Sequence, residues 1–590
     1  MDRISALREQ MKLHHIDAYI IPSTDPHLSE YPASRWKSRA WVSGFTGSAG
    51  TVVITSDKAG LWTDSRYFLQ AETELAGTGI DLYRQGLPDT PSYTEFLIQT
   101  LSSGNTVGFD AQCFGAGEAQ NLIAAFKRKK INIESSFDLI EAIWKDRPSI
   151  PQEPFFAYPA EYAGATTEEK LNRVNNALHQ AGADCTVLCT LDEIAWTFNI
   201  RGTDVSYNPV VVSYAFVSEN ENVLFVERSK LEKETADALM HAGVIIADYN
   251  KIIPYLNNLK EDTIILVDKA KTNLSVYNAI PQHCTKVETA SPVALLKSVK
   301  NETELKGFRN AMVKDGIALT KFFMWLEASL AGGEPLTEIQ IAEQLTAFRS
   351  EQPFYVSDSF GTICGYNEHG AIVHYSATPE TASVVRNEGM LLIDSGAQYF
   401  DGTTDITRTV ALGEPSEAMI KDFTRVLKGH ISLGKCKFPQ GTRGSQLDIL
   451  ARKALWDNGL NYLHGTGHGI GHFLNVHEGP QSIRMDENPV TLQPGMVLSN
   501  EPGLYRTGEY GIRIENLIRV QEDSETEFGK FYSFETLTLF PIDRKLIDPA
   551  MLSVRERVWL NKYHQFVFDT LTPHLNADEQ AWLKQQTAEI

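Results

Sequence analysis

A histidine- and glycine-rich stretch in the last third of the chain carries the residues best suited to chemistry. From 464 to 477 the sequence reads His-Gly-Thr-Gly-His-Gly-Ile-Gly-His-Phe-Leu-Asn-Val-His, with four histidines in fourteen residues. The alternating glycines argue against a helix, because each interior glycine costs about 1 kcal/mol relative to alanine. If the stretch is extended, His464, His468 and His472 share one face. Four histidines upstream of regularly placed carboxylates indicate a metal or catalytic centre rather than a surface glycine loop.

Two apolar strands joined by a turn carry a first pair of carboxylates. The strand 390–394 ends in an aspartate, Asp401-Gly402 is a turn signal, and Asp405 opens the returning strand. In a hairpin centred near residues 399–402, Asp394 and Asp405 lie roughly opposite each other, and a bulge can absorb the remaining offset. Like charges that face each other across strands are destabilising, so the pair needs either a cation or exposure to solvent. The apolar neighbours favour a buried hairpin, and therefore a cation.

Two glutamates follow on later strands. Val497-Leu-Ser-Asn-Glu501 is another apolar strand that ends in a carboxylate. Residues 511–520 alternate between apolar and polar, which predicts one strand with Arg513 and Glu515 on its polar face. For Glu515 alone, a salt bridge to a neighbouring strand is the simpler interpretation. Taken together, the chain offers four carboxylates and a histidine on glycine-flanked sheet elements.

This set of motifs resembles the metallopeptidase family with the pita-bread fold, which includes methionine aminopeptidase, prolidase and aminopeptidase P. The metal ligands of that family run Asp, Asp, His, Glu, Glu, and the matching positions here are Asp394, Asp405, His468, Glu501 and Glu515. The resemblance implies two divalent metal ions with a water or hydroxide between them as the nucleophile. The carboxylate-rich ligand set favours Mn²⁺ over a cysteine-type zinc site. Glu501 is also a candidate general base.

The same resemblance assigns further side chains to the substrate. His374, in Ala-Ile-Val-His-Tyr, and His477 match histidines that flank the substrate and donate to its carbonyl oxygens. His464 resembles a residue behind the metal ligands or in the pocket for proline. Arg66 resembles a residue that contacts longer peptides, from a partner subunit or across a domain cleft, although a surface arginine paired with an acid is an equally simple interpretation. His472 has no counterpart, and we expect it to be a surface or packing histidine.

The resemblance covers essentially the full length and is strongest to the long, three-domain aminopeptidase P branch of cytosolic type. Such enzymes remove the N-terminal residue from peptides with proline at the second position, and their C-terminal extension helps them dimerise. A homodimer and peptide substrates of this kind are therefore expected. The motifs outside the ligand set that carry the likeness are Gly44-Phe-Thr-Gly-Ser-Ala-Gly-Thr, Trp62-Thr-Asp-Ser-Arg-Tyr-Phe, Trp144-Lys-Asp-Arg-Pro, Lys300-Asn-Glu-Thr-Glu-Leu and Phe473-Leu-Asn-Val-His-Glu-Gly-Pro.

The elements before residue 300 predict two copies of one α/β domain. Residues 1–150 and 160–295 each begin with a helix, a polar break and an apolar strand, and the order of later elements also matches. With the resemblance, the expected fold is α/β (α+β). Two tandem creatinase-type domains, at 1–152 and 153–298, precede a pita-bread metallopeptidase domain with a C-terminal extension at 299–590.

Local signals place the borders of these domains. Four prolines between 148 and 159 predict an irregular linker between the two copies. Asn301-Glu-Thr-Glu304 is a capping box, which predicts a long helix at the start of the third domain. Residues 554–590 predict two further helices, with Trp559, Tyr563 and Phe566 as their apolar anchors.

Composition excludes several classes of partner. The chain has 590 residues and a net charge of −21, which argues against nucleic acid and anionic membranes as partners. No apolar leader or run of about 18 apolar residues is present, so neither a secretory signal nor a membrane span is expected. The six cysteines follow no pairing pattern, which in a chain of this size predicts reduced thiols and a cytoplasmic location.

Other functions fit parts of the same pattern. Prolidase uses the same five ligands on Xaa-Pro dipeptides, but usually has one N-terminal domain rather than two. Creatinase shares the fold without the metal ligands, and so does a peptide-binding subunit of a histone chaperone, so the complete ligand set argues against both. A thermolysin-like metallopeptidase is excluded because Gly-Pro follows His477-Glu478, so no His-Glu-x-x-His helix forms.

Overall fold

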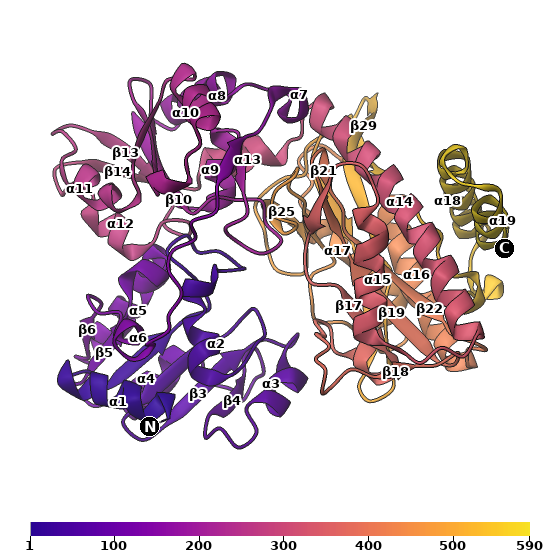
Figure 1. Ribbon diagram of the computed structural model, residues 1–590, viewed down its shortest axis with the longest axis horizontal. Helices are drawn as coiled ribbons and strands as arrows, with labels where there is room; N and C mark the ends of the chain where they lie inside the picture. Colours follow the sequence, from indigo (N-terminus) through magenta and orange to yellow (C-terminus); the bar gives the residue numbers. More distant parts are fainter. Residues whose placement is uncertain (1) are drawn as a thin grey trace. The chain divides into compact units, whose positions relative to one another are not determined.

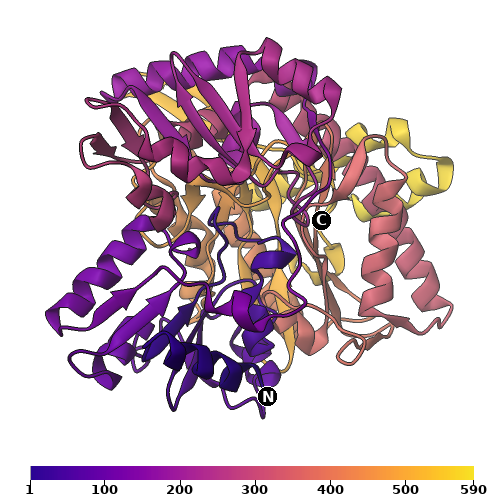
Figure 2. The ribbon, with the colours of Figure 1, turned by 60° about the vertical axis from the view of Figure 1, so that its left-hand side comes forward.

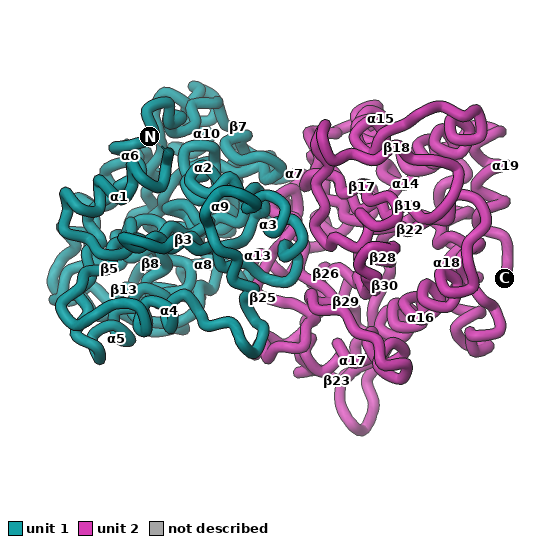
Figure 3. The backbone as a smooth tube through the Cα atoms, turned by 90° about the horizontal axis from the view of Figure 1, so that it is seen from below, with its two compact units in different colours: residues 1–160, 165–296 teal, residues 161–164, 297–590 magenta. Residues whose placement is uncertain are grey.

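The computed structural model describes residues 2–590 and divides into two compact units (Figure 3). Unit 1 comprises the residues up to Ala160 together with Ala165–Leu296. Unit 2 comprises Glu161–Gly164 and Lys297–Ile590. Within the described residues, no helix combines the length and the apolar character that a membrane span requires.

Unit 1 contains two sheets of six strands with the same topology (Figures 1 and 2). In each sheet two neighbouring antiparallel pairs are followed on both sides by parallel pairs, so the predicted duplication is confirmed. The first sheet has the order β4 (Asp81–Arg84), β3 (Ala59–Thr63), β2 (Thr51–Thr55), β1 (Ala18–Ile21), β5 (Thr106–Phe109), β6 (Asn132–Glu134). The second has the order β12 (Val244–Asp248), β11 (Asn222–Val226), β10 (Ser213–Ser218), β8 (Cys185–Leu188), β13 (Ile264–Val267), β14 (Thr285–Glu288).

Helices cover both faces of the first sheet, which explains why its central strand is apolar throughout. On β1, Tyr19 and Ile21 join a core that includes residues of α1 (Arg3–Leu13). Ala18 and Ile20 point the other way, into a core that includes residues of α5 (Ala116–Arg128). A strand buried on both faces needs apolar residues at successive positions, because its side chains alternate between the two sides. In the second copy, α8 (Thr167–Gln180) takes the place of α1, as predicted.

The proline-rich segment between the two copies is more regular than predicted. The strand β7 (Phe155–Ala157) lies inside it and pairs antiparallel with β9 (Ile200–Gly202). The expectation of an irregular linker is therefore wrong at this point. Pro154 and Pro159 flank the strand rather than interrupt it, and a proline at the edge of a short strand removes no ladder hydrogen bond.

Unit 2 combines two helix pairs with antiparallel sheets, the α/β arrangement expected of a pita-bread domain (Figure 1). The paired helices are α14 (Glu302–Ala331) with α15 (Glu338–Ser350), and α16 (Glu417–Gly434) with α17 (Gly444–Trp456). One sheet has the order β17 (Ile363–Tyr366), β19 (Met390–Ser395), β22 (Ile406–Ala411). A larger sheet has the order β23 (Lys437–Pro439), β30 (Gly529–Thr536), β29 (Asn516–Thr526), β26 (Val497–Asn500), β24 (Gly467–Gly469), β25 (Glu478–Ile483).

The long helix α14 begins as predicted and supports the tip of a hairpin. The Asn301 side chain accepts a hydrogen bond from the Glu304 amide at 3.0 Å, and the Asn301 amide donates to the Glu304 carboxylate at 2.9 Å. Three residues after Glu304, a Cβ at Gly307 would lie 2.1 Å from the carbonyl oxygen of Asp401. Only glycine allows this approach, so the Gly307 position brings the turn between β20 (Ala397–Tyr399) and β21 (Gly402–Thr403) directly onto the helix.

The C-terminal residues form the two predicted helices, α18 (Val554–Leu571) and α19 (Ala577–Gln586). Tyr563 is buried and Trp559 packs against the core, as expected. Phe566 is 49% exposed, so its prediction as an anchor is wrong. The buried face of α18 runs through Leu560, Tyr563 and Val567, which follow the three- and four-residue spacing of a helix, and Phe566 lies off that face.

A buried cluster of charges joins the start of unit 2 to the strand that follows the histidine stretch. The Glu478 carboxylate forms ion pairs with Lys297 at 2.9 Å and with Lys300, and the three side chains are each at most 2% exposed. The Lys300 ammonium also donates to the carbonyl of Lys297 at 2.8 Å. Glu478 supplies a negative charge to two buried ammonium groups, and removal of one partner from a buried ion pair is strongly destabilising.

We expect Glu478→Gln to lower the free energy of unfolding by about 3–5 kcal/mol, because it removes the negative charge that pairs with two buried ammonium groups. Thermal and urea unfolding of the two proteins measures the difference. Glu522→Gln is the matched control, since Glu522 forms a surface pair with Lys530 and is 70% exposed. The control should change stability by less than about 1 kcal/mol. Equal effects of the two variants would contradict the interpretation.

Candidate metal centre

All five predicted ligands lie in or beside strands of unit 2, where its two main sheets meet. The first pair comes from the three-stranded sheet and the other three from the larger sheet. Asp394 is in β19, Asp405 immediately precedes β22, His468 is in β24, Glu501 immediately follows β26, and Glu515 immediately precedes β29.

The first two aspartates are diagonal neighbours rather than opposite each other. Asp394 pairs with Thr407 and Ser395 with Ile406, so Asp405 lies two positions from the partner of Asp394. Pairing at the hairpin tip continues this register without a bulge, so the predicted bulge is absent from the described strands. An offset of two residues keeps both carboxylates on one face of the hairpin, because side chains alternate with a period of two.

Three side chains form the tightest cluster. One ligand atom each of Asp405, His468 and Glu515 lies within 4.8 Å of the others. The Nε2 atom of His468 lies 3.5 Å from Asp405 Oδ2 and 3.5 Å from Glu501 Oε1. The other ring nitrogen, Nδ1, is 3.0 Å from the carbonyl oxygen of Gly469, to which it donates. A histidine held in this way presents the lone pair of Nε2 to the carboxylates, which is the orientation of a metal ligand.

Asp394 combines a held oxygen with an unpaired one. Its Oδ2 accepts a hydrogen bond from Nη2 of Arg513 at 2.7 Å. Its Oδ1 is buried and accepts no hydrogen bond from the described residues. Because an unsatisfied buried carboxylate oxygen is costly, this atom fits the chemistry of a cation ligand.

Mutual repulsion perturbs the acid–base behaviour of these carboxylates. Burial, followed by repulsion from Glu515 and Asp394, holds the pKa of Asp405 well above its ordinary range. Burial and repulsion from Glu501 and Asp394 do the same for the pKa of Glu515. Burial raises the pKa of Glu501 to about 7, although Arg513 opposes the shift. Such a group of acids favours a bound divalent cation, which lowers the free energy of their ionised forms.

Only the centre of the histidine stretch is a strand. The strand β24 ends at Gly469, so the prediction that His464, His468 and His472 share one face of an extended segment is wrong. His472 is buried, its Nε2 donates to the carbonyl oxygen of Asp401 at 2.9 Å, and its ring packs edge-on against Phe308. This is the packing role that was one of the two expected for His472.

The remaining predicted histidines of unit 2 lie close to the cluster through different contacts. The ring of His477 is 4.4 Å from that of His468, and its charge lowers the pKa of Glu501. His374 follows Val373, whose carbonyl oxygen accepts a hydrogen bond from Arg513 at 3.4 Å. His464 accepts a hydrogen bond at Nε2 from the Tyr505 hydroxyl at 2.8 Å.

Arg513 and Tyr505 are parts of the site that the motifs did not identify. Arg513 Nη1 donates to the Tyr505 hydroxyl at 2.7 Å, and that hydroxyl donates to His464, so one guanidinium orders Asp394, Tyr505 and His464. Arg513 is 2% exposed. A signal for it was present, because the alternating pattern places Arg513 on the same face as Glu515.

Glu515 lies at a break between two strands rather than within one. The predicted single strand is divided into β28 (Tyr510–Arg513) and β29, and Glu515 sits in the gap. Its amide donates to the Thr407 carbonyl at 3.1 Å, and its carboxylate accepts from the Thr407 hydroxyl at 2.7 Å. Thr407 of β22 therefore replaces the pairing that a continuous strand would have supplied, and it fixes Glu515 beside the aspartate hairpin.

Matches to known families span nearly the whole chain. The model of metallopeptidase family M24 matches residues 306–522, and that of the C-terminal region of peptidase M24 matches residues 530–590. Two models described as Creatinase/Prolidase N-terminal domain match residues 3–143 and 146–304.

Relatives of similar length carry one activity in their names. A probable Xaa-Pro aminopeptidase P of Laccaria bicolor is 41% identical, over 100% of this chain and 93% of its own. Aminopeptidase P2 of Arabidopsis thaliana is 42% identical, over 97% and 86%. The chain belongs to the aminopeptidase P branch of metallopeptidase family M24.

Two solved structures differ in how much of this chain they cover. The X-prolyl aminopeptidase of Caenorhabditis elegans, described as a cytosolic enzyme with a di-nuclear active site, is 36% identical with a TM-score of 0.96 and covers 100% of both chains. An Xaa-Pro dipeptidase of Bacillus anthracis is 25% identical with a TM-score of 0.51, and it covers 64% of this chain but 99% of its own. The dipeptidase thus has no counterpart for about a third of this chain.

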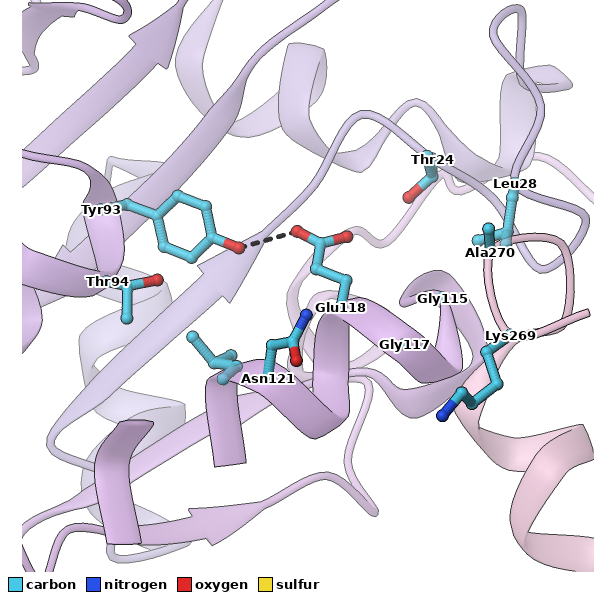
Figure 4. A pocket seen from close by; sticks show the side chains of 11 residues that line it. Thr24, Leu28, Tyr93, Thr94, Gly115, Gly117, Glu118, Asn121, Lys269 and Ala270 are labelled. Atoms are coloured by element: carbon cyan, nitrogen blue, oxygen red, sulfur yellow. Dashed lines mark hydrogen bonds between the residues drawn. The ribbon is translucent and has the colours of Figure 1, made fainter. Parts of the chain in front are cut away.

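Unit 1 holds the remaining predicted residue, Arg66. Its guanidinium forms a two-pronged ion pair with Asp64, at 2.8 and 2.7 Å, and its side chain is 29% exposed. Pairing with an acid was one of the two interpretations of Arg66. A cavity of about 800 Å³ also opens in this unit (Figure 4), but its charged groups are already paired, Glu118 with the Tyr93 hydroxyl and Lys269 with Glu288.

Binding of Mn²⁺ to metal-free protein at pH 6 should release at least one proton. Glu501, with a pKa of about 7, is mostly protonated at that pH, and a cation must displace its proton. Titration calorimetry in buffers of different ionisation enthalpy measures the number released. Glu501→Gln removes the titrating group and should release fewer protons than the wild type. Affinity should fall as pH decreases below 7, and a binding enthalpy independent of the buffer would contradict the prediction.

Proposed function

We propose that this chain is a metal-dependent aminopeptidase that releases the N-terminal residue from peptides with proline at the second position. The observation that carries the proposal is the cluster of Asp405, His468 and Glu515, with Glu501 beside it, in an M24 domain. Relatives that match the chain from end to end and are named for this activity support the choice of substrate.

Two divalent cations bind at this cluster, and Mn²⁺ is the ion that its oxygen-rich ligand set favours. The proposed ligands are Asp394, Asp405, His468, Glu501 and Glu515. When bound, the ions polarise the scissile carbonyl and lower the pKa of water. The pairing of Arg513 with one oxygen of Asp394 leaves the other oxygen for a cation. The donation from His468 Nδ1 to Gly469 leaves Nε2 for a cation in the same way.

Protein side chains transfer the proton and bind the carbonyl oxygens of the substrate. Glu501 accepts the proton of the attacking water and delivers it to the departing proline nitrogen, as a general base and then a general acid. His477, whose ring lies 4.4 Å from that of His468, and His374 donate hydrogen bonds to the carbonyl oxygens on either side of the scissile bond.

Specificity for proline follows from what its peptide bond lacks. The Xaa-Pro bond has no N–H, so a site that accepts proline needs no acceptor at that position. His464 and Tyr505, with rings 5.4 Å apart in an edge-to-face arrangement, form an aromatic corner against which the proline ring packs. Arg66 contacts the far end of longer peptides and exchanges its pair with Asp64 for a substrate carboxylate.

The assembly and location of the protein form part of the proposal. The chain is a cytoplasmic homodimer with three domains, at 1–152, 153–298 and 299–590. Two separate six-stranded sheets in unit 1 support the division of the N-terminal part. Val554, Val558 and Phe566 are exposed on α18, which supports a dimer contact through the C-terminal extension. The cytosolic relative from Caenorhabditis elegans supports the location.

Protein stripped of metal and reloaded with Mn²⁺ should hydrolyse an Xaa-Pro-Xaa tripeptide and should cleave the corresponding Xaa-Pro dipeptide much more slowly. The Bacillus anthracis dipeptidase covers 64% of this chain, and the additional part of this chain is the reason to expect the longer substrate. Release of the free N-terminal amino acid, followed by chromatography together with metal analysis, measures both reactions. Equal or faster cleavage of the dipeptide would show that the protein is a prolidase. Metal-independent cleavage would sink the proposal as a whole.

Asp405→Ala should lose bound metal and reduce Xaa-Pro-Xaa hydrolysis by at least about 100-fold while the fold is retained. Mutation of residues that merely hydrogen-bond a metal ligand already costs about 10- to 100-fold in metal affinity or activity. The metal-free variant should unfold at the same temperature as the metal-free wild type or at a higher one, since one of the mutually repelling carboxylates is gone. Metal content, turnover and thermal unfolding provide the three readouts. The control is Asp89→Ala, which removes an exposed aspartate of unit 1 and should change none of them. Full activity in Asp405→Ala would rule out the two-metal site.

A further inference from the structure

A fully buried carboxylate outside the metal cluster lies beside the segment that carries His374. Glu338 is the first residue of α15, and its exposed fraction is 0%. The helix is already capped by Thr337, whose side chain accepts from the Gln340 amide, so the Glu338 carboxylate is not needed as a cap. Burial of a charge is costly unless several donors compensate for it. The position of Glu338 therefore calls for an explanation.

Among the described residues, the hydrogen-bond donors to this carboxylate all come from residues 366–383. Two are backbone amides, one is a ring nitrogen and one is a hydroxyl, and together they approach both oxygens. Oε1 accepts from the Tyr366 amide at 2.8 Å and His369 Nδ1 at 2.9 Å, and Oε2 accepts from the Tyr375 hydroxyl at 2.9 Å, the Ser383 amide at 2.8 Å and His369 Nδ1 at 3.0 Å.

These donors surround His374 in the sequence. Tyr375 is its immediate neighbour, and the rings of His369 and Tyr375 stack at 4.4 Å. On the other side of His374, the Val373 carbonyl accepts a hydrogen bond from Arg513, the guanidinium that also holds Asp394. The backbone at His374 is thus held between Glu338 and the arginine of the metal cluster.

The charge on Glu338 matters as much as its shape. His369 is the one basic side chain within ion-pair distance of Glu338 in the described part of the chain, and Glu338 raises the pKa of His369. Two backbone amides point at different oxygens, so both oxygens must act as acceptors. A glutamine of the same size would direct an NH₂ group at one of these amides. It would therefore break at least one bond to the segment and leave that amide unpaired.

We propose that Glu338 is a positioning residue for peptide hydrolysis, which fixes residues 366–383 so that His374 meets the substrate carbonyl. The proposal rests on the function proposed above, and specifically on the role of His374. Glu338 itself touches neither the metal ligands nor the substrate. Its effect passes through Tyr375 and His369 to the backbone of His374, where a displacement of about 1 Å can cost about 100-fold in rate.

Four proteins test the proposal as a double-mutant cycle: the wild type, Glu338→Gln, His374→Ala and the double variant. We expect Glu338→Gln to reduce kcat on an Xaa-Pro-Xaa tripeptide by about 10- to 100-fold, with an unchanged number of bound Mn²⁺ ions. In the His374→Ala background the same substitution should have less than about a twofold effect, because the group it positions is absent. Additive losses would overturn the proposal.

A purely structural role for Glu338 predicts a different result. Thermal unfolding of Glu338→Gln would then shift, while kcat measured well below the unfolding midpoint would stay at the wild-type value. Hydrogen exchange followed by mass spectrometry provides a second readout, and exchange should increase in residues 366–383 but not in β24 or β26. Glu343→Gln, on the exposed side of the same helix, is the matched control and should change none of these quantities.

Tyr375→Phe keeps the experiment decisive if Glu338→Gln does not fold. It removes one donor to Glu338 without leaving a buried amide unpaired, and should reduce kcat by about 3- to 10-fold, with no further loss in the His374→Ala background. Unchanged kcat in Tyr375→Phe would count against the proposal. Failure of the proposed function has a separate signature, since the wild type itself would then leave the tripeptide intact.

Discussion

Electrostatic repulsion among buried carboxylates is the constraint on which unit 2 depends. Asp405, Glu501 and Glu515 lie together where two sheets meet, and burial combined with their mutual repulsion raises the pKa of each. Several other buried carboxylates of the unit have an arginine partner, as Asp315 has Arg349 and Asp448 has Arg452. The ligand carboxylates share one guanidinium, that of Arg513, and a histidine whose Nδ1 is engaged with a carbonyl. The excess negative charge is therefore concentrated at the position where a divalent cation would bind.

The residues around the cluster hold the ligands in place through hydrogen bonds from uncharged side chains and from one arginine, Arg408. Arg408 is fully buried and donates to the carbonyl oxygen of Glu515, to the Asn516 side chain and to the hydroxyl of Tyr563 on α18. His430 donates a hydrogen bond to the backbone carbonyl of Asn500 and accepts one from the side chain of Asn516. These two asparagines are next to the ligands Glu501 and Glu515. Burial and the charge of Arg408 lower the pKa of His430 to about 3, so its ring stays neutral and can accept this bond. The C-terminal helices thus reach the metal cluster through Tyr563.

The sequence predicted the parts of the fold that depend on local pattern. Repeated helix and strand signals predicted the duplication in unit 1, and the Asn301 capping box predicted the start of α14. Departures occur where distant contacts decide. Thr407, which lies in the other sheet, donates a hydrogen bond to Glu515 at the interruption of the strand. The Asp401 carbonyl, packed on Gly307, accepts a hydrogen bond from the buried His472. Neither partner is near in the sequence, so periodicity alone could not reveal them.

In the candidate site, too, local motifs were predictable and distant contacts were not. Its ligands were predictable because each lies in or beside a strand and belongs to a recognisable motif, whereas the groups that orient them were missed. Arg513 has a visible signal in its alternation with Glu515, but Glu338 has none, because a lone glutamate at the start of a helix is ordinarily a solvated residue that favours the helix dipole. Its role emerges only when the fold brings residues 366–383 around it.

The two histidines proposed to touch substrate are supported by opposite charge arrangements. Beside His477, Glu478 is compensated by two lysines, so that strand is anchored to the start of unit 2. Beside His374, Glu338 is compensated by backbone amides, Tyr375 and His369, and by no lysine or arginine among the described residues. Each of the two segments is thus tied to a buried carboxylate, and loss of either charge would leave buried donors without their acceptor.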